Sequence, residues 1–156
     1  MSLILSIETS TEVCSVAVHK EGVLIGSQRY DLAKSHSTLL AAVIQETLSN
    51  SEVQVEDLSA VAVSAGPGSY TGLRIGVSTA KGISYARNIP LIALDSLNVI
   101  YESYKPFHLS GQLAIPMMDA RRMEVYCQAR RHDGTYAFQS KPLIIDEDAL
   151  TEYADQ

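Results

Sequence analysis

The sequence predicts an α/β protein with a mixed five-stranded sheet and helices on both faces, and three features lead to this fold class. The chain up to Tyr30 contains a short apolar β-rich run, a stretch with the two-residue alternation of a β-strand, and a hairpin turn that leads into a third strand. An almost wholly apolar run at residues 60–64 indicates a buried strand of the parallel type. Elsewhere the apolar residues recur with the period of a helix. The resulting order, β-β-β-α-β-α-β-α, is typical of a mixed sheet covered by helices.

The first part of the chain is expected to form three strands and a helix. The strands span residues 3–7, 13–19 and 23–30, and a turn at Glu21-Gly22 joins the last two as a hairpin. A helix is predicted from about residue 37 to 49, with Ser35 and Ser37 as candidate N-caps. One face of that helix carries its apolar residues, namely Leu39, Leu40, Val43, Ile44 and Leu48. A short helical turn or loop is expected over 53–58.

The middle of the chain completes the sheet. The buried strand at 60–64 leads through a glycine-rich segment into a helix from about Gly72 to Arg87, which Asn88 and Pro90 terminate. Residues 91–94 are the expected fifth strand, and a further helix runs from Asp95 or Ser96 to about residue 104.

An internal repeat begins near Gly111. An acid-terminated strand, a second strand and a hairpin turn occur twice in the same order: Leu3–Glu8, Val13–Ala17 and Glu21-Gly22, then Leu113–Asp119, Val125–Ala129 and Asp133-Gly134. We interpret this as a duplication, with an N-terminal lobe at 1–108 and the start of a C-terminal lobe at 109–156. The second lobe lacks helices to cover its sheet, so either it is shortened or the remainder docks onto the first lobe.

Composition limits the function classes. The formal net charge of −6 argues against a protein that binds a nucleic-acid backbone unaided, because phosphate neutralisation needs clustered Lys and Arg. Cys14 and Cys127 are far apart in apolar runs, which predicts buried free thiols. The start has no basic region, and Glu8 interrupts its apolar run, so neither a signal peptide nor a membrane span is expected. These features indicate a soluble protein of the reducing cytoplasm.

The glycine-rich segment from Gly66 to Gly76 joins a strand end to a helix start. Free N–H groups and the positive dipole of a helix N-terminus suit an anion, which makes Glu8, Gly66, Gly68 and Ser69 weak anion-site candidates. The segment is not a nucleotide P-loop, because G-x-x-x-x-G-K-[ST] is absent and Arg74 does not occupy the lysine position.

Small residues recur at steps of four through this segment: Gly68, Gly72, Gly76, Ala80 and Ser84. Each glycine inside a helix lowers helix stability by about 1 kcal/mol relative to alanine. We therefore expect that a neighbouring group packs too closely to leave room for side chains at these positions. The ridge packs closely against the chain's own sheet, packs against a partner helix, or binds phosphate directly.

Other candidate chemistry is sparse. Glu8 and Asp119 end the first strand of each repeat, but too few carboxylates converge for a two-metal nuclease, and Glu8 is either a turn-capping or a functional acid. The histidines (His19, His36, His108 and His132) show no metal-ligand spacing, and a surface role is expected for each. No nucleophile elbow is present. Arg121, Arg122 and Glu124 form a charged turn, interpreted as a solvated hairpin.

Three blocks of sequence resemble the TsaB (YeaZ) family, the accessory subunit of the bacterial tRNA threonylcarbamoyladenosine machinery. The blocks are Ile7–Thr11 with Cys14–Ala17, Gly66–Gly76, and Met118–Tyr126. The resemblance covers essentially the whole chain. The second and third blocks are specific to the family, whereas the first is shared with the wider actin-like ATPase superfamily.

The resemblance implies two ribonuclease-H-like lobes, with strand order 3-2-1-4-5 in the first. It also implies a cytoplasmic subunit that forms homodimers, or heterodimers with its catalytic paralogue TsaD, joined by the ATPase TsaE. The complex transfers a threonylcarbamoyl group to the adenosine beside the anticodon of tRNAs reading A-starting codons. The chain meets tRNA only through the complex.

One departure from the paralogue bears on mechanism. TsaD-like proteins carry an H-x-x-x-H metal pair after the strand that matches residues 90–94, and Ser96 and Ile100 stand there instead. We therefore expect no catalytic residue, no metal site and no cofactor bound by this chain alone, with ATP or ADP left open at the complex interface. The older glycoprotease label of the superfamily is not expected to apply.

The leading hypothesis is a non-catalytic scaffold that pairs with TsaD through its helices. The predicted interface residues are Leu39, Val43, Gly72, Gly76 and Ala80, and Gly76→Leu is expected to leave the monomer folded while abolishing pairing. One alternative is an ATP-dependent phosphotransferase of actin-like fold that uses Glu8 and Asp119. Another is a stand-alone homodimeric interaction module.

Overall fold

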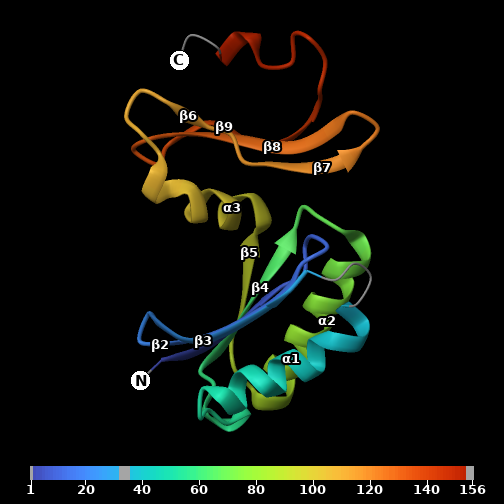
Figure 1. Ribbon diagram of the computed structural model, residues 1–156, viewed down its shortest axis with the longest axis vertical. Coiled ribbons are helices and arrows are strands. Elements are labelled where there is room, and N and C mark those ends of the chain that lie inside the picture. The colour runs from blue at the N-terminus through green and yellow to red at the C-terminus, as the bar shows by residue number, and fades with distance from the viewer. Residues whose placement is uncertain (1, 32–35, 154–156) are drawn as a thin grey trace. The chain divides into compact units, whose positions relative to one another are not determined.

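The computed structural model describes residues 2–31 and 36–153, which form two compact units, one up to Leu94 and one from Asp95 on (Figure 1). This division places the helix that begins at Ser96 in the second unit, whereas the lobes expected from the sequence divide at 108/109. The assignment of lobes by topology stays a prediction. None of the helices in these residues is both long and apolar enough to cross a membrane.

The first unit is built on a five-stranded mixed sheet of order β3-β2-β1-β4-β5. The strands are β1 Leu3–Glu8, β2 Cys14–Lys20, β3 Val23–Tyr30, β4 Ala60–Gly66 and β5 Leu91–Asp95. β1 pairs antiparallel with β2 and parallel with β4. This confirms both the mixed sheet and the strand order that the family resemblance implied.

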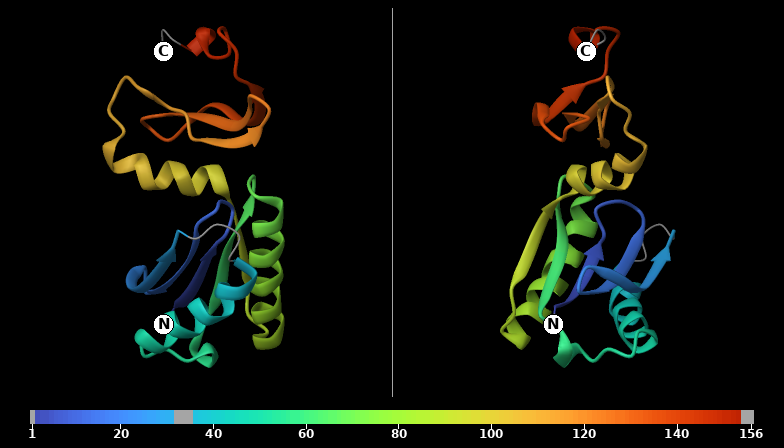
Figure 2. Two further views of the ribbon diagram at one scale, coloured as in Figure 1. Left: turned by 45° about the vertical axis from the view of Figure 1, so that its right-hand side comes forward. Right: turned by 90° about the vertical axis from the view of Figure 1, so that its left-hand side faces the viewer.

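Two helices of this unit, α1 His36–Asn50 and α2 Tyr70–Arg87, lie side by side (Figures 1 and 2). They share one core with alternate residues of the sheet, among them Leu5, Val16 and Val63. Strand residues on one face alternate with residues on the other, so this pattern buries one face under the helix pair. A short 3-10 helix, η1 Val55–Asp57, confirms the helical turn expected within 53–58.

The helix starts differ from those expected. Ser37 lies inside α1 rather than at its cap, and Ser35 is outside the described residues. α2 begins at Tyr70, two positions before the predicted start, because Ser69 caps it. Its end agrees with the prediction, since Asn88 adopts the left-handed conformation of a helix C-cap.

The second unit contains α3 Ser96–Tyr104, the 3-10 turn η2 Lys105–Phe107, and a four-stranded antiparallel sheet. β8 Glu124–Arg131 pairs with β9 Tyr136–Ile144 on one side and with β6 Leu113–Ala114 and β7 Met117–Arg121 on the other. The single strand expected over 113–118 is thus split, at Ile115-Pro116, because proline has no N–H for a strand ladder. A last 3-10 turn, η3, spans Thr151–Tyr153.

The meander β7-β8-β9 follows the same antiparallel pattern as β1-β2-β3, as the internal repeat predicts.

Candidate functional site

The carboxylate of Glu8 lies where β1 and β4 end, at the edge of the sheet at which ligands of α/β folds bind. Its Oε1 accepts a hydrogen bond from the N–H of Ser10 at 2.6 Å, and its Oε2 accepts one from the hydroxyl of buried Ser64. Both carboxylate oxygens therefore bind groups of the chain itself. The sequence left Glu8 as either a turn-capping acid or a functional acid. Its hydrogen bonds are those of a turn-capping acid.

The start of α2 is also engaged by the chain. The hydroxyl of Ser69 accepts a hydrogen bond from the N–H of Gly72 at 3.3 Å, and the N–H of Ser69 donates to the carbonyl of Ser10 at 2.6 Å. Gly66 and Gly68 have φ angles of 118° and 154°, a region that side chains rarely allow. The residues proposed as weak anion candidates (Glu8, Gly66, Gly68 and Ser69) thus form one strand-to-helix junction, in which the turn carbonyl of Ser10 binds the helix start.

The small-residue ridge of α2 packs against the turn between β1 and β2. A Cβ placed on Gly72 would lie 2.1 Å from the carbonyl oxygen of Thr9, and one on Gly68 would lie 2.3 Å from that of Ser10. At Gly76 the added atom would lie 2.1 Å from Oγ1 of Thr9. Ala80 and Ser84 continue the ridge and are buried. The glycines therefore serve close packing within the unit, against the turn after β1 rather than against the sheet itself.

This packing corrects the choice of interface residues. Val43, Gly72, Gly76 and Ala80 are buried inside the first unit, and Leu39 is partly buried against its core. None of the buried four presents a surface to a partner. Contrary to the expectation from sequence, Gly76→Leu should disrupt the unit itself, because its side chain would overlap Thr9.

An open groove lies beside the ridge, between α1, α2 and η1, and has a volume of about 570 Å³. Its apolar lining is Ile44, Leu48, Val53, Val55 and Ile83, and its remaining residues are Ala41, Gln45, Ser49, Gln54 and Thr79. This surface is not among the sites predicted from the sequence. The sequence does contain a pattern that predicts it, because residues four apart lie on one face of a helix. Beside the buried residues, each helix has a second set with this spacing: Ala41, Gln45 and Ser49 on α1, and Thr79 and Ile83 on α2.

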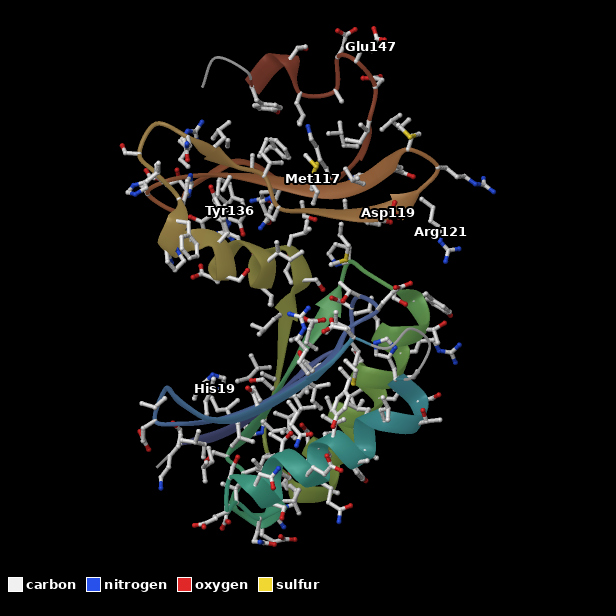
Figure 3. The ribbon with its side chains drawn as sticks, in the orientation of Figure 1. His19, Met117, Asp119, Arg121, Tyr136 and Glu147 are labelled. Atoms are coloured by element: carbon white, nitrogen blue, oxygen red, sulfur yellow. The ribbon has the colours of Figure 1, made fainter. Side chains whose placement is uncertain are left out.

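The second acid of the repeat, Asp119, has a different role. Its Oδ1 accepts the N–H of Arg121 at 2.8 Å at the tip of the β7–β8 hairpin (Figure 3). Three successive residues of this turn, Arg121, Arg122 and Met123, have positive φ, at 70°, 55° and 61°. Each left-handed residue other than glycine costs roughly 1–2 kcal/mol. The charged turn expected as an ordinary solvated hairpin is therefore strained.

Ser96 and Ile100, the positions at which the family resemblance implies the loss of a histidine pair, both lie on α3. Ser96 is its first residue and only 1% exposed, and Ile100 is half-buried. The carboxylate of Asp95 caps this helix, accepting the N–H groups of Leu97 at 2.8 Å and Asn98 at 3.0 Å. A hydroxyl and an alkyl group provide no imidazole ligand at these positions.

Two histidines are buried, contrary to the surface role expected for all of them. His36 contacts the carbonyl of Val13 through Nε2 at 3.2 Å, which ties the start of α1 to β2. His108 contacts the hydroxyl of Tyr101 and the carbonyl of Gln112. Cys14 and Cys127 are free and buried as predicted, and burial raises the pKa of both thiols.

Comparison with known proteins agrees with these features. The family described as TsaD, tRNA N6-adenosine threonylcarbamoyltransferase, matches residues 30–155. The tRNA threonylcarbamoyladenosine biosynthesis protein TsaB of Bacillus subtilis is 36% identical over 123 residues, which are 79% of this chain and 52% of that protein. TsaB of Haemophilus influenzae is 32% identical, with 97% of this chain and 65% of that protein covered. The structure of YeaZ from Pseudomonas aeruginosa superposes with a TM-score of 0.79 at 27% identity, covering 93% of this chain and 68% of that one.

The mixed five-stranded sheet with its helices and the match to the TsaD family model define an α/β protein of the TsaD type. The chain belongs to the TsaD family and, within it, to the TsaB (YeaZ) family. It spans about half to two thirds of the length of the curated TsaB relatives compared here.

Proposed function

We propose that this chain is a non-catalytic scaffold or activating subunit for threonylcarbamoyl transfer to the adenosine beside the anticodon of tRNAs reading A-starting codons. In this proposal it acts in the cytoplasm by pairing with TsaD, with TsaE joining the pair. The observation that carries the proposal is an open apolar groove between two helices in a chain whose curated relatives are named for tRNA threonylcarbamoyladenosine biosynthesis.

The groove supplies the pairing surface that the buried glycines do not. Its floor is apolar, and its rim carries small or uncharged side chains such as Ala41, Gln45 and Ser49. A partner helix can therefore approach without burying an unpaired charge. We propose that a helix of TsaD, or of a second copy in the homodimer, lies in this groove.

Features of both units support the absence of transfer activity. In the first unit, both oxygens of Glu8 and the N–H of Ser69 are engaged within the chain. In the second unit, Ser96 and Ile100 stand where we expect the histidine pair of TsaD-like proteins. These hydrogen bonds leave fewer acceptor positions on Glu8 for a metal-bound water, and they occupy the Ser69 N–H that a phosphate would need. We therefore propose that catalysis belongs to TsaD.

Reconstitution of tRNA threonylcarbamoylation with and without this chain tests the function. With TsaD, TsaE, tRNA, threonine, bicarbonate and ATP present, omission of the chain should abolish modification. Full modification without it would refute the subunit role.

A matched pair of variants tests the groove. Ala41 and Ala42 are neighbouring exposed residues of α1, but only Ala41 lines the groove. Ala41→Arg should abolish co-purification with TsaD and lower tRNA modification at least tenfold, while Ala42→Arg should behave as the parent chain. Equal behaviour of the two variants would place the partner elsewhere.

Two alternatives have their own tests. For an ATP-dependent phosphotransferase, calorimetry with Mg-ATP would show micromolar binding with turnover, which the engaged Glu8 and Ser69 disfavour. For a stand-alone homodimeric module, the dimer would persist, and the cell would modify tRNA normally without the chain.

A further inference from the structure

The tip of the β7–β8 hairpin departs from the turn chemistry of the β2–β3 and β8–β9 hairpins. The turns after β2 and β8 contain glycine at a positive φ, Gly22 at 80° and Gly134 at 85°. The β7–β8 turn instead has positive φ at Arg121, Arg122 and Met123 in succession. Two-residue hairpin turns with positive φ at both central residues strongly favour Asn-Gly, and Arg122-Met123 occupy that place between the paired residues Arg121 and Glu124.

The strained turn is held firmly at both sides. Asp119 accepts the N–H of Arg121 at 2.8 Å, and the carbonyl of Met123 accepts the N–H of Ile145 at 2.7 Å. Strain of this kind persists where the surrounding structure fixes it, and it concentrates at functional sites. The backbone thus fixes the positions from which two adjacent arginine side chains leave the turn before any ligand arrives.

Those two arginines differ from the others in the chain. The side chain of each other arginine has a partner within the chain. Arg29 forms an ion pair with Asp31, and Arg74 lies over the ring of Tyr70. The remaining three donate hydrogen bonds: Arg87 to the carbonyl of Glu56, Arg130 to the side chain of Asn98, and Arg131 to the carbonyl of Tyr136. Arg121 and Arg122 are exposed, and within the described residues their side chains contact no carboxylate and no aromatic ring. Across the turn Glu124 pairs with Arg121 through the backbone register, without an ion pair.

We propose that the Arg121–Arg122 turn is a phosphate-binding element. Guanidinium groups match phosphate oxygens with paired hydrogen bonds, and two of them on a fixed turn bind adjacent phosphates. In a chain of net charge −6, such a local element is also what allows contact with a polyanion. The phosphates belong either to a nucleoside triphosphate or to an RNA backbone. The choice of RNA as the source rests on the proposed function, whereas the binding of phosphate by the turn does not.

Binding of three probes to the full chain tests the proposal: inorganic triphosphate, ATP and a tRNA transcript, each at several salt concentrations. Arg121→Gln/Arg122→Gln should weaken triphosphate binding at least tenfold. The control Lys20→Gln/Arg29→Gln makes the same change in charge on the β2–β3 hairpin and should stay within twofold of the parent. Unchanged binding of all three probes in the Arg121/Arg122 variant, or equal loss in the control, overturns the proposal.

The probes separate the two sources. If RNA is the ligand, the slope of log affinity against log salt for tRNA should fall by about 1.5, since each phosphate contact contributes roughly 0.7–0.9. If a nucleotide is the ligand, ATP binding should fall while tRNA binding and its slope stay constant. Because triphosphate binding is measured on the chain alone, failure of tRNA modification in reconstitution would refute the proposed function without touching this result.

A second variant separates phosphate binding from a merely structural role. Arg122→Asn/Met123→Gly supplies the preferred turn residues, so its Tm should rise while triphosphate binding falls at least threefold. If binding instead follows stability and rises with Tm, the arginines act only in the fold and the proposal is wrong.

Discussion

The hydroxyl of Thr9 donates a hydrogen bond of 2.8 Å to the carbonyl oxygen of Gly72, which lies 63 residues further along the chain. The contact brings the turn after β1 against the first turns of α2. It is feasible because Gly72 has no side chain: a Cβ there would lie 2.1 Å from the carbonyl oxygen of the same threonine. The ridge of α2 and the turn therefore form one packed unit.

The contact at Gly72 predicts a position-specific effect of alanine in α2. Gly72→Ala should destabilise the chain by about 1–3 kcal/mol, because the new methyl group meets backbone rather than a movable side chain. Gly82 of the same helix has open space around it, so Gly82→Ala should stabilise by up to about 1 kcal/mol. Urea unfolding of both variants measures the difference. A stabilising effect at both positions would contradict the packing described.

Asn98 of α3 provides a second test, within the second unit. Its Oδ1 accepts hydrogen bonds from Gln128 at 2.8 Å and from Arg130 at 2.6 Å. Gln128 is only 1% exposed, so Asn98→Ala should leave its amide without that partner and cost about 1–3 kcal/mol in thermal unfolding. The exposed Asn50 is the control, and Asn50→Ala should change stability by less than about 0.5 kcal/mol. Similar losses in both variants would argue against this network.

The β8–β9 turn predicts a pKa shift that depends on one hydroxyl. The hydroxyl and the N–H of Thr135 both donate hydrogen bonds to the carboxylate of Asp133. These bonds lower the pKa of Asp133, and the bond from the hydroxyl has the larger effect. The contribution to stability is therefore present above the pKa of the unfolded chain and is lost as pH falls through the lowered value. Thr135→Val should raise the pKa of Asp133 toward its ordinary value, while the retained N–H keeps part of the shift. NMR titration of the Asp133 carboxyl measures it, and an unchanged midpoint would refute the assignment.

The two cysteines should be unreactive in the folded chain. Burial raises the pKa of Cys14 and Cys127, and the Lys141 ammonium opposes part of that rise at Cys127. Alkylation at neutral pH should thus be slow for both thiols and should become fast only in denaturant. Mass spectrometry of each labelled peptide measures the rates. Rapid labelling of either cysteine without denaturant would contradict its burial. Lys141→Met should raise the pKa of Cys127 further and leave Cys14 unchanged.

Local patterns in the sequence predicted the first unit well, because its elements are long and their periods distinct. The alternation of β1 and β2 and the run at β4 came close to the observed strands, and the turn residues placed the hairpin. The start of α2 was misplaced because Ser69 lies inside a glycine-rich segment where a cap is difficult to recognise. The break at Pro116 was missed because the apolar run continues through it.

The candidate site was harder to predict, because a four-residue period of glycines reports close packing but not what packs there. Gly72 and Gly76 contact Thr9, a residue remote in sequence, and only the fold brings them together. The pair Glu8–Ser64 has the same origin, since the carboxylate and the hydroxyl come from neighbouring parallel strands. The strain at Arg121 and Arg122 is invisible in composition, because arginine has no general tendency to adopt positive φ.

The contact between Thr9 and Gly72 also bears on how the chain acquires its structure. A hydrogen bond across 63 residues forms only after the chain between them has closed into a loop, which costs conformational entropy that local hairpins avoid. The β1–β2 hairpin can form early, but its turn reaches its final position only when α2 docks. Substitutions at Gly72 should accordingly accelerate unfolding more than they slow refolding. Because the junction forms late in folding, it determines how long the native state persists before it unfolds.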